Sequence, residues 1–329
     1  MKKLILILSI VLVGLLSACG NNGTDDSNVV YVTVYPMQYL VEQIAGDTIE
    51  VKRVPGSNTH SESIDWGAQE IISMLDADLL FYINGGVDTY IPNNADTTFA
   101  DGNVELVDMS SHIEYNEVCY TDAHDHSYEA PTEEHTGDEH TEETIDCEEN
   151  QLAEDPHFWL DPVRMLEAAT FIKDKLIATF PENGALYDNN FTVLNASLEK
   201  LDQDYQTMAD EATKPIITTT MLFTYWNERY DIEILPITTS AHSTENVPGD
   251  IIHFVEEAEY HSIQYILFEM NANSPAGDQV LSQLQEVNET ASKLYLHGLG
   301  NLTTEELEQG KTYLTIMYEN LDTLKIATK

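Results

Sequence analysis

The sequence predicts an α/β protein with two lobes, each built on a mostly parallel sheet, joined by one long helix. Eight runs rich in β-branched and aromatic residues alternate with helix-like periodicity and fall into two sets of four. Strands that alternate with helices form parallel sheets, so each set predicts one lobe. The first set lies at 29–35, 49–54, 78–83 and 104–109, and the second at 215–219, 232–237, 264–269 and 293–297.

A single helix is expected between the two sets of strands. After Gly184 and before Pro215, apolar residues recur at spacings of three and four, which places them on one stripe of a helix. We expect this stripe to pack in the core, and the helix to run the length of the molecule. The predicted boundaries are 29–183 for the N-terminal lobe, 184–213 for the linking helix and 214–329 for the C-terminal lobe. The stripe consists of Tyr187, Phe191, Leu194, Leu198, Leu201, Tyr205 and Met208.

The first residues have the pattern of an export signal. Two lysines precede an apolar run that is too short to favour a membrane-spanning helix, and small residues lead to Cys19. The stretch Leu16-Ser17-Ala18-Cys19 resembles a bacterial lipobox, in which the cysteine becomes the lipidated first residue of the mature chain. This predicts a signal peptide at 1–18, a lipidated tether at 19–28 and a membrane anchor through Cys19. An ordinary cleaved signal peptide is the alternative.

The chain is strongly acidic. It carries 58 Asp and Glu residues against 14 Lys and Arg, which gives a formal net charge of -44. Such a surface repels nucleic acid and anionic lipid headgroups, so neither is expected as a partner. Cations are the expected small ligands.

A segment bounded by Cys119 and Cys147 concentrates histidines and carboxylates and contains no Lys or Arg. It shows no regular pattern that would hold ligands at a fixed geometry, so it is not expected to be the main metal site. A solvated charge run is the alternative to a weak metal-binding loop. The two cysteines are expected to bond to each other in an exported chain, and a pair of zinc ligands is the competing interpretation. The histidines of the segment are His124, His126, His135 and His140.

Four further histidines lie near predicted strand ends, where ligands collect in open α/β sheets. One follows the turn P-G-S-N-T, and another lies in D-P-H-F-W-L-D-P, where prolines restrict the backbone on both sides. The other two follow strands of the second set. These candidate ligands are His60, His157, His242 and His297, whereas His112, His253 and His261 are expected to be structural.

With these motifs in place, the sequence resembles the zinc-uptake solute-binding family, the metal-binding lipoproteins of bacterial ABC importers. The resemblance implies a metal-type periplasmic binding protein fold, in which one rigid helix joins two α/β lobes and the metal is buried between them. It also implies ABC permease and ATPase subunits as partners and an extracytoplasmic, lipid-anchored location. The motifs are the strand entering Tyr35-Pro36, P-G-x-x-x-H at 55–60, A-D-L-L-F-Y-I-N-G-G at 77–86 and D-P-H-F-W-L-D-P at 155–162.

The resemblance also assigns ligand positions. By motif match, His60 and His157 take the two positions of the N-terminal lobe. The family's third ligand, a His or Glu before an aromatic residue, falls on Thr220, whose hydroxyl is a poor zinc ligand. The fourth, an Asp or Glu, falls on His297. We expect His242 to replace the lost third ligand, with Glu269 or a water held by Thr220 as alternatives.

The resemblance implies capture of a metal ion for import. Zn(II) is the expected metal, because imidazole suits zinc better than it suits manganese, which favours oxygen. Mn(II) is the second candidate. The His-rich segment 119–147 matches the place of a family loop and is expected to collect zinc weakly. Two other classes of function remain: a surface zinc hydrolase with Glu62 or Asp65 as general base, and an adhesin or surface chaperone with structural zinc. The sequence contains neither G-x-S-x-G nor H-E-x-x-H.

Overall fold

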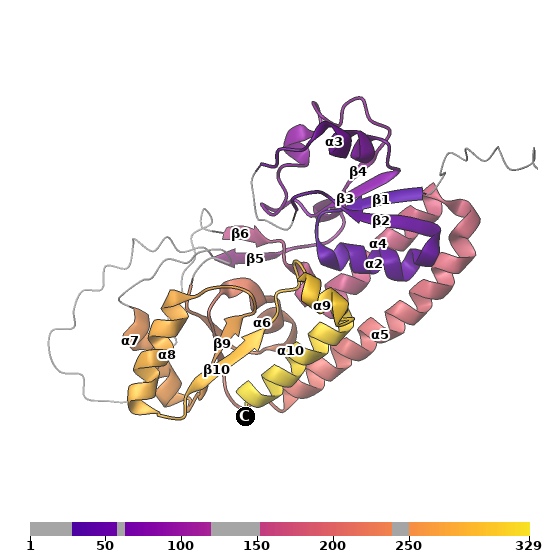
Figure 1. Ribbon diagram of the computed structural model, residues 1–329. Coiled ribbons are helices and arrows are strands. Elements are labelled where there is room, and N and C mark those ends of the chain that lie inside the picture. Colours follow the sequence, from indigo (N-terminus) through magenta and orange to yellow (C-terminus); the bar gives the residue numbers. More distant parts are fainter. Residues whose placement is uncertain (1–27, 58–62, 120–151, 239–249) are drawn as a thin grey trace, which may run out of the picture.

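The computed structural model describes residues 28–57, 63–119, 152–238 and 250–329 (Figure 1). The N-terminal lobe is built on a four-stranded parallel sheet of order β2-β1-β3-β4. β1 lies inside the sheet, with β2 on one side of it and β3 and β4 on the other. The order of the strands therefore reverses between β1 and β3, which is the switch point of the sheet. Its strands are β1 (Asn28–Val32), β2 (Ile49–Arg53), β3 (Leu79–Tyr82) and β4 (Glu105–Asp108).

The C-terminal lobe repeats this design with a parallel sheet of order β10-β9-β7-β8. Its switch point lies between β7 and β9. Ligands bind at the carboxyl ends of strands next to such a point, which directs attention to the loops after these two strands. The strands are β7 (Ile216–Thr218), β8 (Ile234–Pro236), β9 (Tyr265–Glu269) and β10 (Ser292–Leu296).

One long helix, α5 (Gly184–Asp210), runs from the N-terminal lobe along the side of the C-terminal lobe (Figure 1). It packs against the preceding helix α4 (Pro162–Thr179), which begins where the Asp161 carboxylate accepts a hydrogen bond of 2.7 Å from the Val163 N–H. Six of the seven residues of the predicted apolar stripe are buried, and Phe191 is partly buried against the same core. The predicted two-lobed α/β architecture with one linking helix is confirmed.

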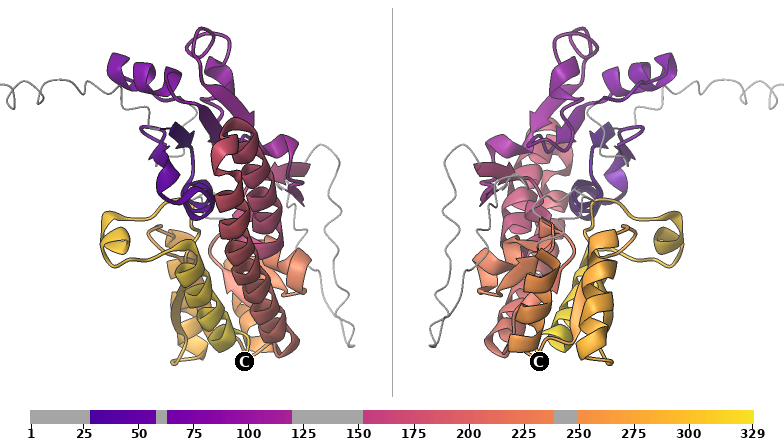
Figure 2. Two further views of the ribbon diagram at one scale, coloured as in Figure 1. Left: turned by 90° about the vertical axis from the view of Figure 1, so that its right-hand side faces the viewer. Right: turned by 90° about the vertical axis from the view of Figure 1, so that its left-hand side faces the viewer.

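The helices on this side of the molecule form one apolar core that is common to both lobes. It combines side chains of α2 (Tyr35–Ala45), α4, α5 and α10 (Tyr313–Ala327). In Figure 2, α4 and α5 lie side by side, and α10 lies beside the lower part of α5. Because interior side chains are closely packed, such a core resists relative movement of the elements that share it.

Two local features differ from the sequence prediction. The first predicted strand extended to Tyr35, but β1 ends at Val32 and α2 begins at Tyr35, since Pro36 fits the first turn of a helix. A two-stranded antiparallel ribbon of β5 (Asn116–Cys119) and β6 (Leu152–Asp155) was not predicted. This ribbon pairs the backbone on either side of 120–151, with Cys119 opposite Leu152. The predicted disulfide lies outside the described residues, as does the Cys119 side chain.

The remaining elements complete the two lobes. The further α-helices are α3 (Ala68–Leu75), α6 (Tyr225–Tyr230), α7 (Asp250–Tyr260), α8 (Pro275–Val287) and α9 (Thr304–Glu308). Short 3-10 turns occur at Gly46–Thr48, Pro92–Asn94, Met109–Ser111, Phe158–Leu160, Pro181–Asn183 and Met221–Phe223. Over the described ranges, none of the helices has the length and apolar character needed to cross a membrane.

Candidate metal centre

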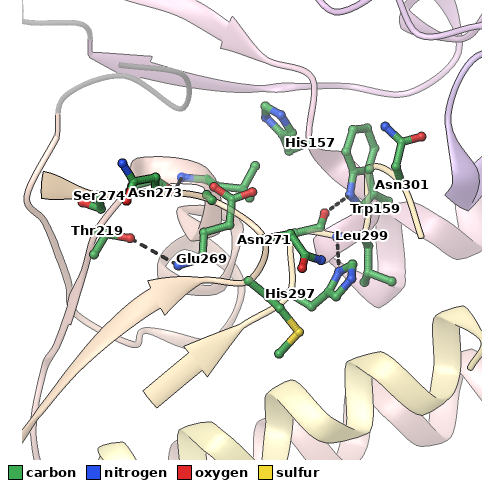
Figure 3. Close-up of a pocket in the computed structure, with 16 residues that line it drawn as sticks. His157, Trp159, Thr219, Glu269, Asn271, Asn273, Ser274, His297, Leu299 and Asn301 are labelled. Carbon is green, nitrogen blue, oxygen red and sulfur yellow. Dashed lines mark hydrogen bonds between the residues drawn. The ribbon is translucent and has the colours of Figure 1, made fainter. Parts of the chain in front are cut away.

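A cavity of about 590 Å³ lies between the lobes, at the carboxyl ends of β7, β9 and β10 (Figure 3). The N-terminal lobe contributes His157 and Trp159, which follow the ribbon strand β6. The C-terminal lobe contributes Glu269, His297 and neutral polar side chains such as Asn301. The cavity therefore receives possible metal donors from both lobes.

His157 is buried, and a carboxylate fixes the orientation of its ring. The Nδ1 atom lies 2.6 Å from Oδ1 of Asp155, and the same oxygen accepts a hydrogen bond of 3.0 Å from the His157 backbone N–H. With the Nδ1 proton donated to Asp155, the lone pair of the ring is on Nε2. A carboxylate–histidine pair of this kind is typical of metal-binding histidines.

Asp155 is itself held in place from the C-terminal lobe. Its Oδ2 accepts a hydrogen bond of 3.0 Å from the Thr224 hydroxyl, and its carbonyl oxygen accepts one of 2.6 Å from the Tyr225 hydroxyl. Asp155 was not predicted to have a role at the site. The signal was present as an acidic residue two positions before His157 in D-P-H, within reach of the imidazole.

Glu269 ends β9, beside the switch point of the C-terminal sheet. Its backbone N–H donates to the Thr219 hydroxyl at 3.2 Å, which links the ends of the two strands. Burial raises the pKa of Glu269 to about 6, although the nearby His157 opposes the shift. The carboxylate also lies against Gly298, where a Cβ atom would be 3.0 Å from Oε1 of Glu269. Gly298 thus permits this close approach.

His297 directly follows β10 and also lines the cavity. Its Nδ1 accepts a hydrogen bond of 2.8 Å from the Leu299 N–H, which places the ring proton on Nε2. Nε2 lies 3.2 Å from Oε1 of Glu306, but the two are not aligned as a hydrogen bond. Burial lowers the pKa of His297, so the neutral ring is favoured. Coordination of a metal through this imidazole therefore requires the ring to turn.

Thr220 lines the same cavity at the position where the family pattern has a ligand. Its hydroxyl oxygen accepts a hydrogen bond of 3.2 Å from the Leu222 N–H and begins the short turn that follows. Thr220 therefore has a structural role as the cap of this turn. Its hydroxyl is also a weak ligand for a metal.

The structure brings His157, His297 and the alternative candidates Thr220 and Glu269 to one cavity. Within 28–57, 63–119, 152–238 and 250–329, no three His, Cys, Asp or Glu side chains are grouped closely enough to hold a metal. The histidines predicted to be structural are not in the cavity; His112, for example, stacks on Phe171 at 3.7 Å. The predicted residues that lie outside the described ranges are His60, His242, Cys19, Cys147, His124, His126, His135 and His140.

A cavity between two parallel-sheet lobes, with possible metal donors on both walls and a helical core shared by the lobes, is the arrangement of a solute-binding protein. The chain belongs to the family described as zinc-uptake complex component A, periplasmic, whose profile matches residues 30–327. The family membership predicted from the sequence motifs is thereby confirmed.

Relatives of the chain carry related names. It is 28% identical over 319 residues to the high-affinity zinc uptake system protein ZnuA of Bacillus subtilis, covering 94% of this chain and 93% of that protein. It is 27% identical over 338 residues to the zinc-binding lipoprotein AdcA of Streptococcus pneumoniae, covering 100% of this chain. The chain spans 61% of the length of AdcA.

Solved structures share the fold. The metal-dependent lipoprotein YcdH from Bacillus subtilis superimposes with a TM-score of 0.70 at 25% identity, over 92% of this chain and 99% of that one. The Zn(II)-bound ZnuA-like domain of Streptococcus pneumoniae AdcA gives a TM-score of 0.67 at 24% identity, over 92% and 98% of the two chains. The two-lobed architecture is therefore that of the family.

Proposed function

We propose that the protein captures Zn(II) outside the cytoplasm and delivers it to the permease of an ABC importer. The observation that carries this proposal is the position of His157, with its ring oriented by Asp155, in a cavity whose other wall carries Glu269 and His297. A site divided between two lobes suits capture followed by release, because a small relative movement of the lobes breaks the coordination. The names of the relatives support zinc as the metal.

The proposed ligands are His60 and His157 from the N-terminal lobe and His242 and His297 from the C-terminal lobe. Glu269 and a water held by Thr220 are the alternatives to His242, and both residues line the cavity. His297 can bind through Nδ1 only after it releases the Leu299 N–H. Comparison of Glu269→Gln with His242→Gln by zinc titration distinguishes Glu269 from His242. The true ligand is expected to lose on the order of a hundredfold in affinity or more, and the other residue much less.

Equilibrium titration of the purified chain with Zn(II) and with Mn(II) tests the function directly. We expect one tight zinc site that a chelator empties, and weaker binding of manganese, since nitrogen donors favour zinc. Tight manganese binding with weak zinc binding would instead support a manganese carrier.

A zinc hydrolase is the proposal from a different class. Of its two proposed general bases, Asp65 is exposed and does not line the cavity, and Glu62 lies outside the described residues. Incubation of the zinc-loaded protein with peptide and ester substrates should give no turnover. Zinc-dependent hydrolysis that is lost in Asp65→Asn or Glu62→Gln would replace the carrier proposal.

The His-rich segment is proposed to be an accessory collector of zinc. Deletion of 121–145 should leave the tight site intact and remove additional weak sites, which a titration above one equivalent of zinc detects. Loss of the tight site on deletion would place the main ligands in the segment. We further propose that Cys19 carries the lipid anchor and that permease and ATPase subunits complete the importer; mass spectrometry of the membrane-extracted chain tests the anchor.

A further inference from the structure

Arg53 is a partly buried cation at the junction of the two lobes. It ends β2, and its Nη2 lies within hydrogen-bond distance of the Thr33 carbonyl oxygen at 2.7 Å and the Ser57 hydroxyl at 3.2 Å in its own lobe. The same Nη2 donates to Oδ1 of Asn301, in the C-terminal lobe, at 2.6 Å. The guanidinium thus connects strand ends of one lobe to a cavity residue of the other.

The charge of Arg53 has no carboxylate partner within 4.0 Å among the described residues, although the protein is rich in acids. Its Nε atom is buried and has no hydrogen-bond partner among the residues that the structure describes. Burial lowers the pKa of Arg53 to about 10, so the group stays charged at neutral pH. The charged guanidinium makes strong hydrogen bonds to its neutral acceptors. When the guanidinium and these acceptors separate, water hydrates the charge and offsets part of the loss.

The two ends of this contact adjoin the segments that carry proposed ligands. Ser57 is the last described residue before 58–62, which contains His60, and Asn301 lies in the loop that follows His297. A second interlobe bond lies beside it, from the Tyr35 N–H to the Gly300 carbonyl oxygen at 3.1 Å. The two bonds therefore join the lobes at residues that line the cavity, Gly300 and Asn301.

We propose that the Arg53–Asn301 hydrogen bond is an interlobe latch, and that Arg53 is a positioning residue that sets the rate at which the protein releases its metal. The inference rests on the proposed function, because it assigns a role within zinc capture and release. Its effect passes through the separation of the lobes and does not require Arg53 to touch the ion.

Two substitutions of Asn301 should change the rate of zinc dissociation in opposite directions. Asn301→Ala removes the acceptor and should speed zinc dissociation roughly tenfold, as expected for loss of one charge-assisted hydrogen bond. Asn301→Asp supplies a carboxylate to the same guanidinium and should slow dissociation below that of the wild type. A side chain that only filled space would not give these opposite results.

The same contact is tested from its other end. Arg53→Gln should release zinc as fast as Asn301→Ala, Arg53→Lys should restore part of the retention, and the double variant Arg53→Gln/Asn301→Ala should be no faster than the faster single variant. Arg229→Gln is the matched control, since it breaks an arginine pair with Asp202 that lies outside the cavity. It should leave the rate unchanged.

The experiment measures zinc dissociation by stopped-flow transfer to a chromophoric chelator, together with hydrogen exchange of the metal-free protein. In the metal-free state, Asn301→Ala should speed amide exchange at Tyr35, and Asn301→Asp should slow it. Dissociation rates within twofold of the wild type in both Asn301 variants, with unchanged exchange at Tyr35, would overturn the latch. If the wild type fails to bind zinc tightly, the proposed function fails, and the exchange data still decide whether the latch exists.

Discussion

The two lobes meet through two different kinds of contact. On the helix side, α4, α5 and α10 contribute to one apolar core, whereas around the cavity the lobes are joined by separate hydrogen bonds such as Arg53 to Asn301 and Trp159 to Gly298. If the side chains of the core separate, water cannot replace their packing contacts. If a hydrogen bond beside the cavity opens, water can bind to the freed donor and acceptor. We therefore expect the helix side to act as a fixed hinge and the cavity side to open and close.

The largest expected effect is a loss of stability caused by a substitution in the apolar core on the helix side. Leu201→Ala removes a fully buried side chain of α5 and should lower the free energy of unfolding by about 2–5 kcal/mol. Zinc affinity of the folded protein should change little, because the side chain does not line the cavity. Denaturant unfolding and zinc titration measure the two quantities. Val193→Ala, at a position 65% exposed on the same helix, is the control and should cost less than about 0.5 kcal/mol.

The next effect concerns a buried acid that also belongs to the helix side. Burial raises the pKa of Asp161 from 3.8 to about 6, against the hydrogen bond from the Val163 N–H, which lowers it. The folded state thus holds this proton more tightly than the unfolded chain, so the stabilisation is complete below pH 3.8 and is lost as the pH rises through 6.

Asp161→Asn keeps a capping side chain but removes the charge. Relative to the wild type, its free energy of unfolding should rise by up to about 3 kcal/mol between pH 4 and pH 7. Denaturant titrations at several pH values check this. A difference between variant and wild type that stays constant, or falls with pH, would contradict the assignment of a raised pKa.

On the cavity side, the support of His157 provides a sharper test. Asp155→Asn leaves the imidazole in place but removes the carboxylate that orients it, so zinc affinity should fall roughly ten- to hundredfold. Competition with a chelator of known affinity measures the loss. His112→Ala is the control, since that ring stacks on Phe171 outside the cavity. Equal affinity in wild type and Asp155→Asn would exclude His157 as an oriented ligand.

The smallest effect concerns the glycine after His297. A Cβ at Gly298 would lie 2.5 Å from Leu222 Cδ2 and 3.0 Å from Oε1 of Glu269, so Gly298→Ala must displace both side chains. If Glu269 helps to bind the metal, zinc affinity should fall by about tenfold or less, as expected for a modest shift of one donor. Gly310→Ala is a comparison outside the cavity, where the added Cβ meets no atom within 4 Å but the positive φ is strained. Its effect should appear in stability and not in affinity.

The sequence predicted the regular parts of the fold closely, because hydrophobic periodicity reports directly on burial. Each strand of the two parallel sheets appears within a few residues of its predicted position, and α5 buries the expected stripe. The ribbon of β5 and β6 was missed because short strands that flank a long polar segment have too few residues to show a period. Its pairing depends on contacts between residues far apart in the chain.

The candidate site was predictable in position but not in bonding. Strand ends and the D-P-H motif led to His157 and His297, and both line the cavity. Glu269, named from the sequence as an alternative ligand, lines the same cavity beside Gly298. The sequence could not show that the Leu299 N–H uses the Nδ1 lone pair of His297. Nor could it reveal that Arg53 and Asn301, 248 positions apart, join the lobes, since such contacts depend on how the lobes pack.

The most direct test of the central claim is a crystal structure of the protein with one equivalent of zinc, with anomalous diffraction collected at the zinc edge. We predict a single strong peak in the cavity between the lobes, within bonding distance of His157 Nε2 and of donors from the C-terminal lobe. A peak in the segment 119–147, or at a surface away from His157, would contradict the account.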